Sequence, residues 1–193
     1  METGLIQVYT GNSKGKTTAA LGLAIRAIGH GLKVNFIQLM KGSNYYGELV
    51  TIHRLYPDIV HAQFGRSCPN SGSIKLGISK CTGCGRCFIR KGEDITEDKK
   101  EMEIAYDYIK KQIKGGQFHI IILDEILNCI YFGLITEEEV LDLFRIKPPH
   151  VELVLTGRNA PARIIEEADL VTNMESIKHP FEKGINARRG IEY

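Results

Sequence analysis

Short apolar segments rich in β-branched residues alternate along the chain with longer segments in which apolar residues recur every three to four positions. The first pattern is typical of buried strands and the second of amphipathic helices. We expect strands at residues 5–9, 33–39, 58–64, 119–123 and 151–157, and a weaker sixth at 169–174. We expect helices at residues 17–29, 96–113, 125–132, 136–144 and 161–167. This alternation predicts an α/β fold with a doubly wound, mostly parallel sheet.

The length of the chain fits one domain. It has 193 residues, of which 43% are hydrophobic, and this is enough for one well-packed core. The composition changes once, in a segment rich in Gly, Ser, Cys and Lys at residues 66–92. We therefore predict a single domain over residues 1–193, with residues 66–92 as a cysteine-rich insertion within it.

The charges of the chain nearly balance, with 25 Lys and Arg against 23 Asp and Glu. Such a balance gives no basic field that would favour nucleic acid or an anionic membrane, so small molecules are the expected partners. The first residues lack the basic start, apolar stretch and cleavage site of a leader peptide, and no apolar run has the length of a membrane span. The sequence predicts a soluble, cytoplasmic protein.

Residues 10–18, TGNSKGKTT, resemble a phosphate-binding loop in which Thr10 stands where the usual pattern has its first glycine. The segment follows an expected strand and opens an expected helix, which is the context that this motif requires. Backbone N–H groups at the helix start would face phosphate oxygens, Lys16 would add a positive charge, and the Thr17 hydroxyl would bind Mg²⁺ or Mn²⁺. Gly15 would let the backbone approach the phosphates closely. The loop therefore predicts a P-loop nucleotide site.

Two acidic residues follow the most apolar segment of the sequence. Residues 120–123 are continuously apolar, as expected for a strand buried on both faces, and Asp124 and Glu125 lie at its carboxyl end. In nucleotide-binding sheets a carboxylate at such a position lies opposite the phosphate loop and binds the metal ion or its water. The same two residues also fit an acidic helix cap. Together with the loop, they favour a magnesium site.

Motifs along most of the chain resemble one family. The stretch YTGNSKGKTTAALGLAIRAIGHG is similar to the signature of the ATP:corrinoid adenosyltransferases of cobalamin biosynthesis, whose loop also begins Thr-Gly-Asn. Further matches are QLMKG, the Gly-Glu pair at 47–48, ILDEI at 122–126, TEEEV at 136–140, LTGRNAP at 155–161 and the ending IKHPFEKGINARRGIEY. These motifs occur in the family's order outside residues 67–87. The resemblance implies a P-loop NTPase fold of the RecA-like type.

The resemblance also implies the reaction: a cobalt(I) corrinoid attacks the ribose 5′ carbon of ATP, and triphosphate leaves. The catalytic residues it implies are Lys16, Thr17 and Glu125, because negative charge grows on the leaving triphosphate. Thr17, Asp124 and Glu125 would hold the magnesium ion. Arg158 fits either a phosphate contact or an ion pair with a nearby acid. The expected ATP-binding residues are Gly11, Asn12, Ser13, Lys14, Gly15, Lys16, Thr17, Thr18, Arg26 and Arg158.

The chain departs from the family pattern after residue 64. Relatives commonly read Gly-Phe-Thr-Trp there, whereas this sequence contains no tryptophan. In the family, aromatic residues close over the corrinoid and remove the lower ligand of cobalt. Tyr45, Tyr46 and Phe88 are candidates for that role, and ordinary packing is the alternative.

Four cysteines lie where the resemblance ends, at Cys68, Cys81, Cys84 and Cys87, with the spacing C-x12-C-x2-C-x2-C. Four thiolates suit either Zn²⁺ or a [4Fe–4S] cluster, and thiols without a metal are the third alternative. A cluster would pass an electron to cobalt(II) beside the corrinoid. Cys129 lies apart in an expected helix, where it fits a small buried residue.

The implied partners are ATP, a corrinoid and an electron donor such as a reduced flavoprotein or ferredoxin. If the protein forms an oligomer, we expect a homodimer. Two other functions fit the loop and the acidic pair. One is a small-molecule or nucleoside kinase with a zinc-stapled lid, which would make ADP and a phosphorylated product. The other is a non-catalytic, redox-sensing switch that binds ATP and makes no product.

Overall fold

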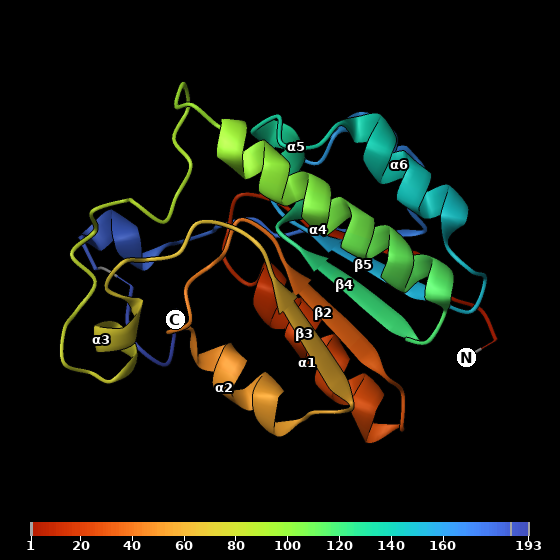
Figure 1. Cartoon of the computed structure of the whole chain (residues 1–193), viewed down its shortest axis with the longest axis horizontal. Coiled ribbons are helices and arrows are strands. Elements are labelled where there is room, and N and C mark those ends of the chain that lie inside the picture. The colour runs from red at the N-terminus through yellow and green to blue at the C-terminus, as the bar shows by residue number, and fades with distance from the viewer. Residues whose placement is uncertain (1, 186, 193) are drawn as a thin grey trace.

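The computed structural model describes residues 2–185 and 187–192 of the chain. Within these residues, six strands form one sheet in the order β3-β2-β4-β5-β1-β6 (Figure 1). All neighbouring strands run parallel. The strands are β1 (Ile6–Thr10), β2 (Val34–Gln38), β3 (Ile59–Gln63), β4 (Ile120–Asp124), β5 (Glu152–Thr156) and β6 (Leu170–Asn173). The predicted parallel α/β sheet is confirmed, including its weaker sixth strand.

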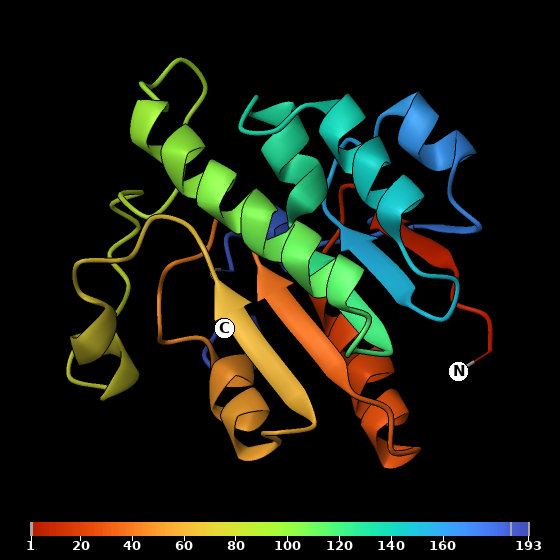
Figure 2. The same ribbon diagram turned by 45° about the vertical axis from the view of Figure 1, so that its right-hand side comes forward.

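Helices cover both faces of this sheet (Figures 1 and 2). One face carries α1 (Lys16–Gly29) and α2 (Gly47–Arg54), and the other carries α4 (Thr96–Gly115), α5 (Ile126–Tyr131), α6 (Glu137–Ile146) and α7 (Ala162–Glu166). Two short helices lie outside the two layers, α3 (Ser71–Lys75) and the 3-10 helix η1 (Pro180–Lys183). The sequence predicts α1, α4, α5, α6 and α7 but not α2, α3 or η1.

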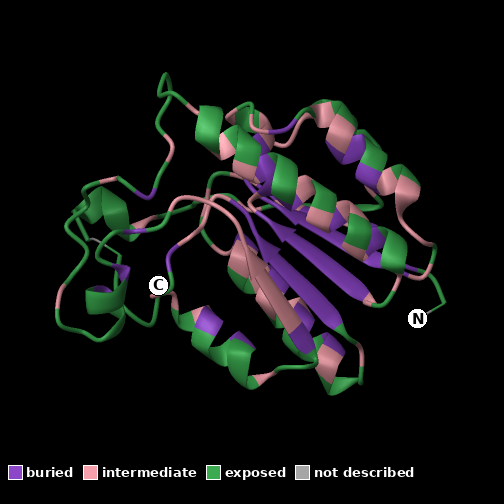
Figure 3. Cartoon of the chain, viewed as in Figure 1, coloured by how far each residue is buried: buried purple, intermediate pink, exposed green. Residues whose placement is uncertain are grey.

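The core is divided by the sheet into two clusters. On β4, Ile121 and Leu123 face the cluster under α4, whereas Ile120 and Ile122 face the cluster under α1. Because β4 is buried on both faces, every one of its positions must be apolar until the strand ends, which explains the continuous run in the sequence. Figure 3 shows this buried centre and the largely exposed segment between β3 and α4.

The sheet topology brings the two sequence motifs together. β1 and β4 are both neighbours of β5, and parallel strands end at the same edge of a sheet. The loop after β1 and the acidic pair at the end of β4 therefore meet at this edge, as expected for ligand sites in open α/β sheets. In the described part of the chain, no helix combines the length and apolar character needed to cross a membrane.

Candidate active site

The predicted phosphate loop is the turn between β1 and α1, and two glycines determine its shape. Gly15 caps the start of α1 with φ 114°, and Gly11 has φ 101°. Residues with a side chain rarely adopt this left-handed backbone. A Cβ atom on Gly11 would also overlap the carbonyl oxygen of Met174, which follows β6. The loop can therefore lie this close to the end of β6 only if residue 11 is a glycine.

Lys16 folds back over the loop that precedes it. Its Nζ donates hydrogen bonds to the carbonyl oxygens of Gly11 (2.7 Å) and Ser13 (2.6 Å). Burial lowers the pKa of Lys16, and Glu125 acts in the opposite direction. The ammonium group lies beside the first turn of α1, whose N–H groups have no partner inside the helix. Charge and helix dipole thus favour an anion at the same place.

Asp124 lies at the centre of the site and is fully buried. Its Oδ1 accepts hydrogen bonds from the hydroxyls of Thr17 (2.8 Å) and Thr156 (2.7 Å), and its Oδ2 accepts one from Lys41 (2.8 Å). Burial raises the pKa of this carboxyl, but the Lys41 charge and these hydrogen bonds outweigh burial, so the pKa lies below its ordinary value. Asp124 is therefore an ionised carboxylate linked directly to the phosphate loop.

Glu125 directs a second carboxylate toward the loop. Its backbone is left-handed (φ 69°), a conformation that costs a side-chain-bearing residue on the order of 1 kcal/mol or more. Its N–H donates to the hydroxyl of Thr156 (2.9 Å), and Asn128 donates to its Oε2 (2.5 Å). Burial and the neighbouring Asp124 raise the pKa of Glu125. These contacts hold the strained backbone and fix the carboxylate at the site.

Lys41 belongs to the site, although the sequence shows it only within the motif QLMKG. It follows β2, and its side chain is 18% exposed. Its Nζ lies 2.8 Å from Asp124 and 4.0 Å from Glu125, and 5.9 Å from the centre of the Tyr46 ring. Burial lowers the pKa of Lys41, but the two carboxylates outweigh this effect and raise it. Lys41 could have been identified from the sequence because it follows an expected strand of the parallel sheet, and ligand sites lie at the carboxyl ends of such strands.

A cavity of about 620 Å³ opens beside the phosphate loop. Most of the predicted ATP-binding residues and two of the three predicted magnesium ligands, Thr17 and Glu125, line it: Ser13, Lys14, Gly15, Lys16, Thr17, Thr18, Glu125 and Arg158. The remaining lining residues come from four other parts of the chain: Phe88, Asn128, Tyr131, Phe132, Asn159, Ile191 and Glu192. The volume suits a nucleotide-sized ligand.

Three predicted ATP-binding residues do not line the cavity. Gly11 and Asn12 contribute to the loop backbone behind it. Arg26 is exposed in the last turn of α1. It lies ten positions after Lys16, which corresponds to about 15 Å along a helix. The structure therefore does not bring Arg26 to the phosphate loop.

Two cations at the cavity differ in their partners. Lys14 forms an ion pair with Glu192 in the C-terminal segment (3.0 Å). The backbone N–H of Arg158 donates to Asn128 Oδ1 (2.7 Å), which holds the residue at the cavity wall. Among residues 2–185 and 187–192, the Arg158 guanidinium has no ion-pair partner, so the second of its two expected roles, an ion pair with a nearby acid, is not seen.

The four predicted metal-binding cysteines lie in one region but differ in burial. Cys68 and Cys87 are buried in a small cluster of their own, whereas Cys81 and Cys84 are exposed. Within the described residues, no group of three potential metal-ligating side chains is close enough to hold an ion. The prediction of a zinc or iron–sulfur site is thus not matched by an assembled set of ligands, because the loop that carries Cys81 and Cys84 lies open to solvent.

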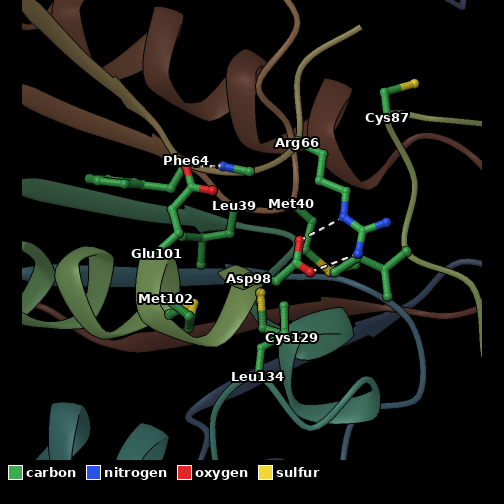
Figure 4. A pocket seen from close by; sticks show the side chains of 12 residues that line it. Leu39, Met40, Phe64, Arg66, Cys87, Asp98, Glu101, Met102, Cys129 and Leu134 are labelled. Carbon is green, nitrogen blue, oxygen red and sulfur yellow. Dashed lines mark hydrogen bonds and ion pairs between the residues drawn. The ribbon is translucent and has the colours of Figure 1, made fainter. Parts of the chain in front are cut away.

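A small void lies between the cysteine segment and the core under α4 (Figure 4). Its volume is about 20 Å³, room for one water molecule. Arg66 lines it and donates two hydrogen bonds of 2.8 Å to Asp98, which anchors the segment to α4. Cys129 also lines it, and burial raises the pKa of its thiol, as expected for a packing residue. This void is a packing defect rather than a ligand site.

These features are typical of a nucleotide-binding α/β protein, with a glycine-shaped loop after β1 and a buried acidic pair at the end of β4. The crystal structure of the flagellar accessory protein FlaH from Methanocaldococcus jannaschii shares the fold. It has a TM-score of 0.52 and 12% sequence identity, over 90% of this chain and 72% of that chain. This similarity supports the parallel α/β fold.

Sequence comparison gives the family. The family model for the ATP:corrinoid adenosyltransferases BtuR/CobO/CobP matches residues 2–193. A corrinoid adenosyltransferase from Sinorhizobium sp. is 35% identical over all of this chain and 81% of its own length. The corrinoid adenosyltransferase CobA of Salmonella typhimurium is 31% identical over all of this chain and 87% of its own length.

The chain belongs to the ATP:corrinoid adenosyltransferase family. It is an enzyme that transfers the adenosyl group of ATP to the cobalt of a corrinoid. The kinase and the non-catalytic switch are not favoured, because the match extends over the whole chain rather than over the phosphate loop alone.

Proposed function

We propose that the phosphate loop binds the triphosphate of ATP and directs the ribose 5′ carbon toward cobalt(I), so that triphosphate is the leaving group. One observation carries this proposal: the Thr17 hydroxyl of the loop lies 2.8 Å from the buried carboxylate of Asp124. This contact brings together the two halves of a metal–phosphate site. The Lys16 ammonium and the N-terminus of α1 would stabilise the charge that grows on the leaving triphosphate.

Magnesium or manganese is the proposed metal, held by Thr17, Asp124 and Glu125. Hydroxyl and carboxylate oxygens are the ligands that these hard cations prefer. The carboxylates of Asp124 and Glu125 already have one cation beside them, because the Lys41 ammonium lies within 4.0 Å of both. When bound, the metal ion would shield the negative charge of the triphosphate. Lys41 would then compete with the metal for Asp124.

Aromatic residues at the cavity are the proposed contacts of the corrinoid. Of the three predicted candidates, Phe88 lines the cavity. Tyr45 and Tyr46 lie against each other with ring centres 4.7 Å apart, next to the cysteine cluster and Lys41. Phe132 and its neighbour Tyr131 also line the cavity. Flat apolar rings suit the face of a macrocycle.

The remaining finer predictions are kept as proposals. Gly11, Asn12 and Arg26 would contribute to nucleotide binding, Arg26 through the nucleoside rather than the triphosphate because of its distance from the loop. The fold would be of the RecA-like type, a single domain with residues 66–92 as an insertion that carries zinc or a [4Fe–4S] cluster. A reduced flavoprotein or ferredoxin would supply electrons, and the protein would be cytoplasmic and, where it associates, a homodimer.

An anaerobic assay tests the proposed reaction. Purified protein is mixed with ATP, Mg²⁺ and chemically reduced cob(I)alamin, and the phosphate product is identified. We expect adenosylcobalamin and inorganic triphosphate in equal amounts.

Lys16→Ala should lower kcat/KM at least about 100-fold, since an electrostatic contact that strengthens in the transition state is lost. Lys14→Ala is the matched control, with a change of less than about tenfold. Formation of ADP, or ATP binding without adenosylation, would contradict the proposal.

A further inference from the structure

The four cysteines are not used by the site described above, and one detail of their sequence distinguishes the alternatives. Cys68 is followed directly by Pro69, and Cys81, Cys84 and Cys87 form a C-x2-C-x2-C run downstream. In bacterial ferredoxins a [4Fe–4S] cluster takes three ligands from such a run and the fourth from a distant cysteine that precedes a proline. Here the proline-linked cysteine lies upstream of the run. The pattern favours a cluster over zinc.

The backbone of the cysteine run turns back toward its first thiol. The N–H of Gly83 donates to the sulfur of Cys81 (3.4 Å), so the chain turns around this sulfur within two residues. Gly83 and Gly85 have φ of 68° and 74°, which allows tight turns here. Hydrogen bonds to sulfur orient and stabilise thiolates that ligate iron.

Cys87 is where the run meets the rest of the cluster. Cys87 and Cys68 are buried in the same small cluster, although Cys68 lies 19 positions earlier in the chain. Cys84 and Cys81 lie three and six positions before Cys87, so the run places all three cysteines in one short loop. Figure 4 shows the Cys87 sulfur pointing away from the void beside Arg66, and thus away from the core under α4. Closing the ligand set requires the exposed loop to move, not the core.

The cysteine run is also adjacent to the reaction cavity. Phe88 follows Cys87 directly and lines the cavity that Lys16 and Glu125 also line. Arg66 holds this connection, because its guanidinium donates to the carbonyl oxygen of Phe88 (3.4 Å) while it is paired with Asp98. A group ligated by Cys87 would therefore lie one residue away from the space in which the corrinoid must bind.

Exposed positive side chains flank the run in sequence: Lys80, Arg86, Arg90 and Lys91. Arg86 and Arg90 line a surface pocket beside Cys84 that Glu93 and Asp94 also line. One of them, Arg90, donates to the backbone carbonyl of Cys84 (3.2 Å) and so lies directly over the run. Positive side chains favour encounter with an acidic protein. Four of them lie close in sequence to the exposed Cys81 and Cys84, which favours an acidic electron carrier as the partner.

We propose that Cys68, Cys81, Cys84 and Cys87 ligate a [4Fe–4S] cluster that passes one electron to a cobalt(II) corrinoid bound in the adjacent cavity. This inference rests on the proposed function. In the transfer, the reduced cluster, [4Fe–4S]⁺, becomes [4Fe–4S]²⁺, and cobalt(II) becomes cobalt(I). An acidic one-electron carrier, such as a reduced ferredoxin or flavoprotein, reduces the cluster again.

Metal analysis of the anaerobically purified full-length chain tests the site. We expect about four iron and four sulfide per chain and a paramagnetic signal after reduction. Cys84→Ser should lose most of the iron, and because this side chain is exposed the fold is expected to persist. Cys129→Ala, at the cysteine outside the cluster, should keep all of it. Zinc in place of iron, no metal, or equal loss of iron in both variants would overturn the proposal.

A single-turnover experiment tests the electron transfer. The cluster is reduced by light with a deazaflavin, the reductant is removed, and cob(II)alamin and Mg-ATP are added. We expect about one adenosylcobalamin per cluster for the wild type and at least tenfold less for Cys84→Ser. With cob(I)alamin supplied, both should react equally.

The reactions with cob(I)alamin and with cob(II)alamin test the proposed function and the proposed electron transfer separately. Failure of the wild type with cob(I)alamin would contradict the proposed function. A reduced cluster that yields no adenosylcobalamin from cob(II)alamin, while cob(I)alamin reacts, would contradict the electron transfer. So would equal yields from cob(II)alamin for the wild type and Cys84→Ser.

Discussion

Lys41 and Asp124 form the most buried ion pair among the described residues, and it lies inside the site rather than in the core. Two charges removed from water are costly, and such a pair persists only where the hydrogen bonds around it are complete. Thr17 and Thr156 supply those bonds to Asp124. The Asp124 carboxylate therefore contributes both to stability and to the site, and substitution of Lys41 or Asp124 tests this.

Lys41→Met should lower the free energy of unfolding by about 3 kcal/mol, because it leaves the buried Asp124 carboxylate without its cation. Urea unfolding at pH 7 without Mg²⁺ measures this effect. Saturating Mg-ATP should recover part of the loss, because the metal ion supplies the missing charge. Lys14→Met is the matched control, since its ion pair with Glu192 is exposed and should contribute less than about 1 kcal/mol. Equal losses in the two variants would show that Lys41 does not stabilise Asp124.

His61 on β3 should make stability depend on pH. Burial, and the nearby His53, lower the pKa of His61 from 6.5 to about 4, and Asp124 acts in the opposite direction. Between these pH values the unfolded chain binds a proton that the folded chain does not. The free energy of unfolding should therefore fall as the pH decreases from about 6.5 toward 4.

Because the His61 ring is partly exposed, we expect its contribution to be about 1 kcal/mol, well below the value for a fully buried group. The measurement is urea unfolding of the wild type and His61→Gln at pH 7 and pH 5. The loss between the two pH values should be smaller for His61→Gln, while His30→Gln, at an exposed residue, should behave as the wild type. An identical pH dependence for all three proteins would refute this explanation.

The glycines of the first helix and its loop differ in what they permit. Position 11 needs a glycine because its backbone is left-handed and because a Cβ atom there would overlap the backbone of Met174. Gly22 lies inside α1, where an added Cβ atom would meet no other atom. Gly11→Ala should therefore abolish ATP binding in equilibrium dialysis, because the loop must move. Gly22→Ala should leave binding unchanged and raise the free energy of unfolding by about 0.5–1 kcal/mol. Normal ATP affinity in Gly11→Ala would show that the loop tolerates a side chain.

At the scale of elements, periodicity predicted all six strands and the helices α1, α4, α5, α6 and α7. Each of these elements except β6, whose residues are all exposed, has residues in the core. Periodicity missed α2, a helix of eight residues with only Leu49 and Ile52 buried. It also missed α3, whose sequence Ser71–Lys75 contains one buried apolar residue, Ile74. Short elements of this kind are held by tertiary contacts that leave no periodic pattern.

The candidate site was predicted in part for a related reason. The loop and the acidic pair are each contiguous in sequence, so local motifs identify them. Lys41 reaches Asp124 only because β2 pairs with β4 across the sheet, and sequence distance conceals this contact. Arg26 lies farther along α1 and does not line the cavity, so its predicted role at the nucleoside stays a prediction.

Over the whole molecule, the C-terminal segment connects parts that are remote in sequence. Glu192 pairs with Lys14 of the phosphate loop, and the guanidinium of Arg189 donates to the carbonyl oxygen of Lys75 at the end of α3 (3.3 Å). Ile191 and Glu192 also line the cavity. Hydrogen bonds from Arg188 and Lys14 lower the pKa of Glu192 to about 2, so it is ionised at neutral pH. The segment therefore adds a negative charge where the triphosphate is expected.

Glu192→Gln should lower the KM for ATP about two- to fivefold, because a repulsive charge is removed and Lys14 is released. Initial rates of adenosylation with cob(I)alamin give this value. Glu182→Gln, at an exposed glutamate of η1 that does not line the cavity, is the control and should leave the KM unchanged. A higher KM in Glu192→Gln would indicate that the carboxylate helps to bind ATP or its metal.

The place of β1 in the sheet has a consequence for synthesis of the chain. β2 can pair with β3 and β4 early, but both neighbours of β1 are strands made about 150 residues later, β5 and β6. At typical elongation rates of about 5–20 residues per second, the first strand waits roughly 7–30 s on the ribosome without a partner. The phosphate loop gains its contact with the end of β6, the hydrogen bond from the N–H of Ser13 to the carbonyl oxygen of Met174 (3.1 Å), only at that point. We expect a nascent chain to bind ATP only after this last strand has emerged.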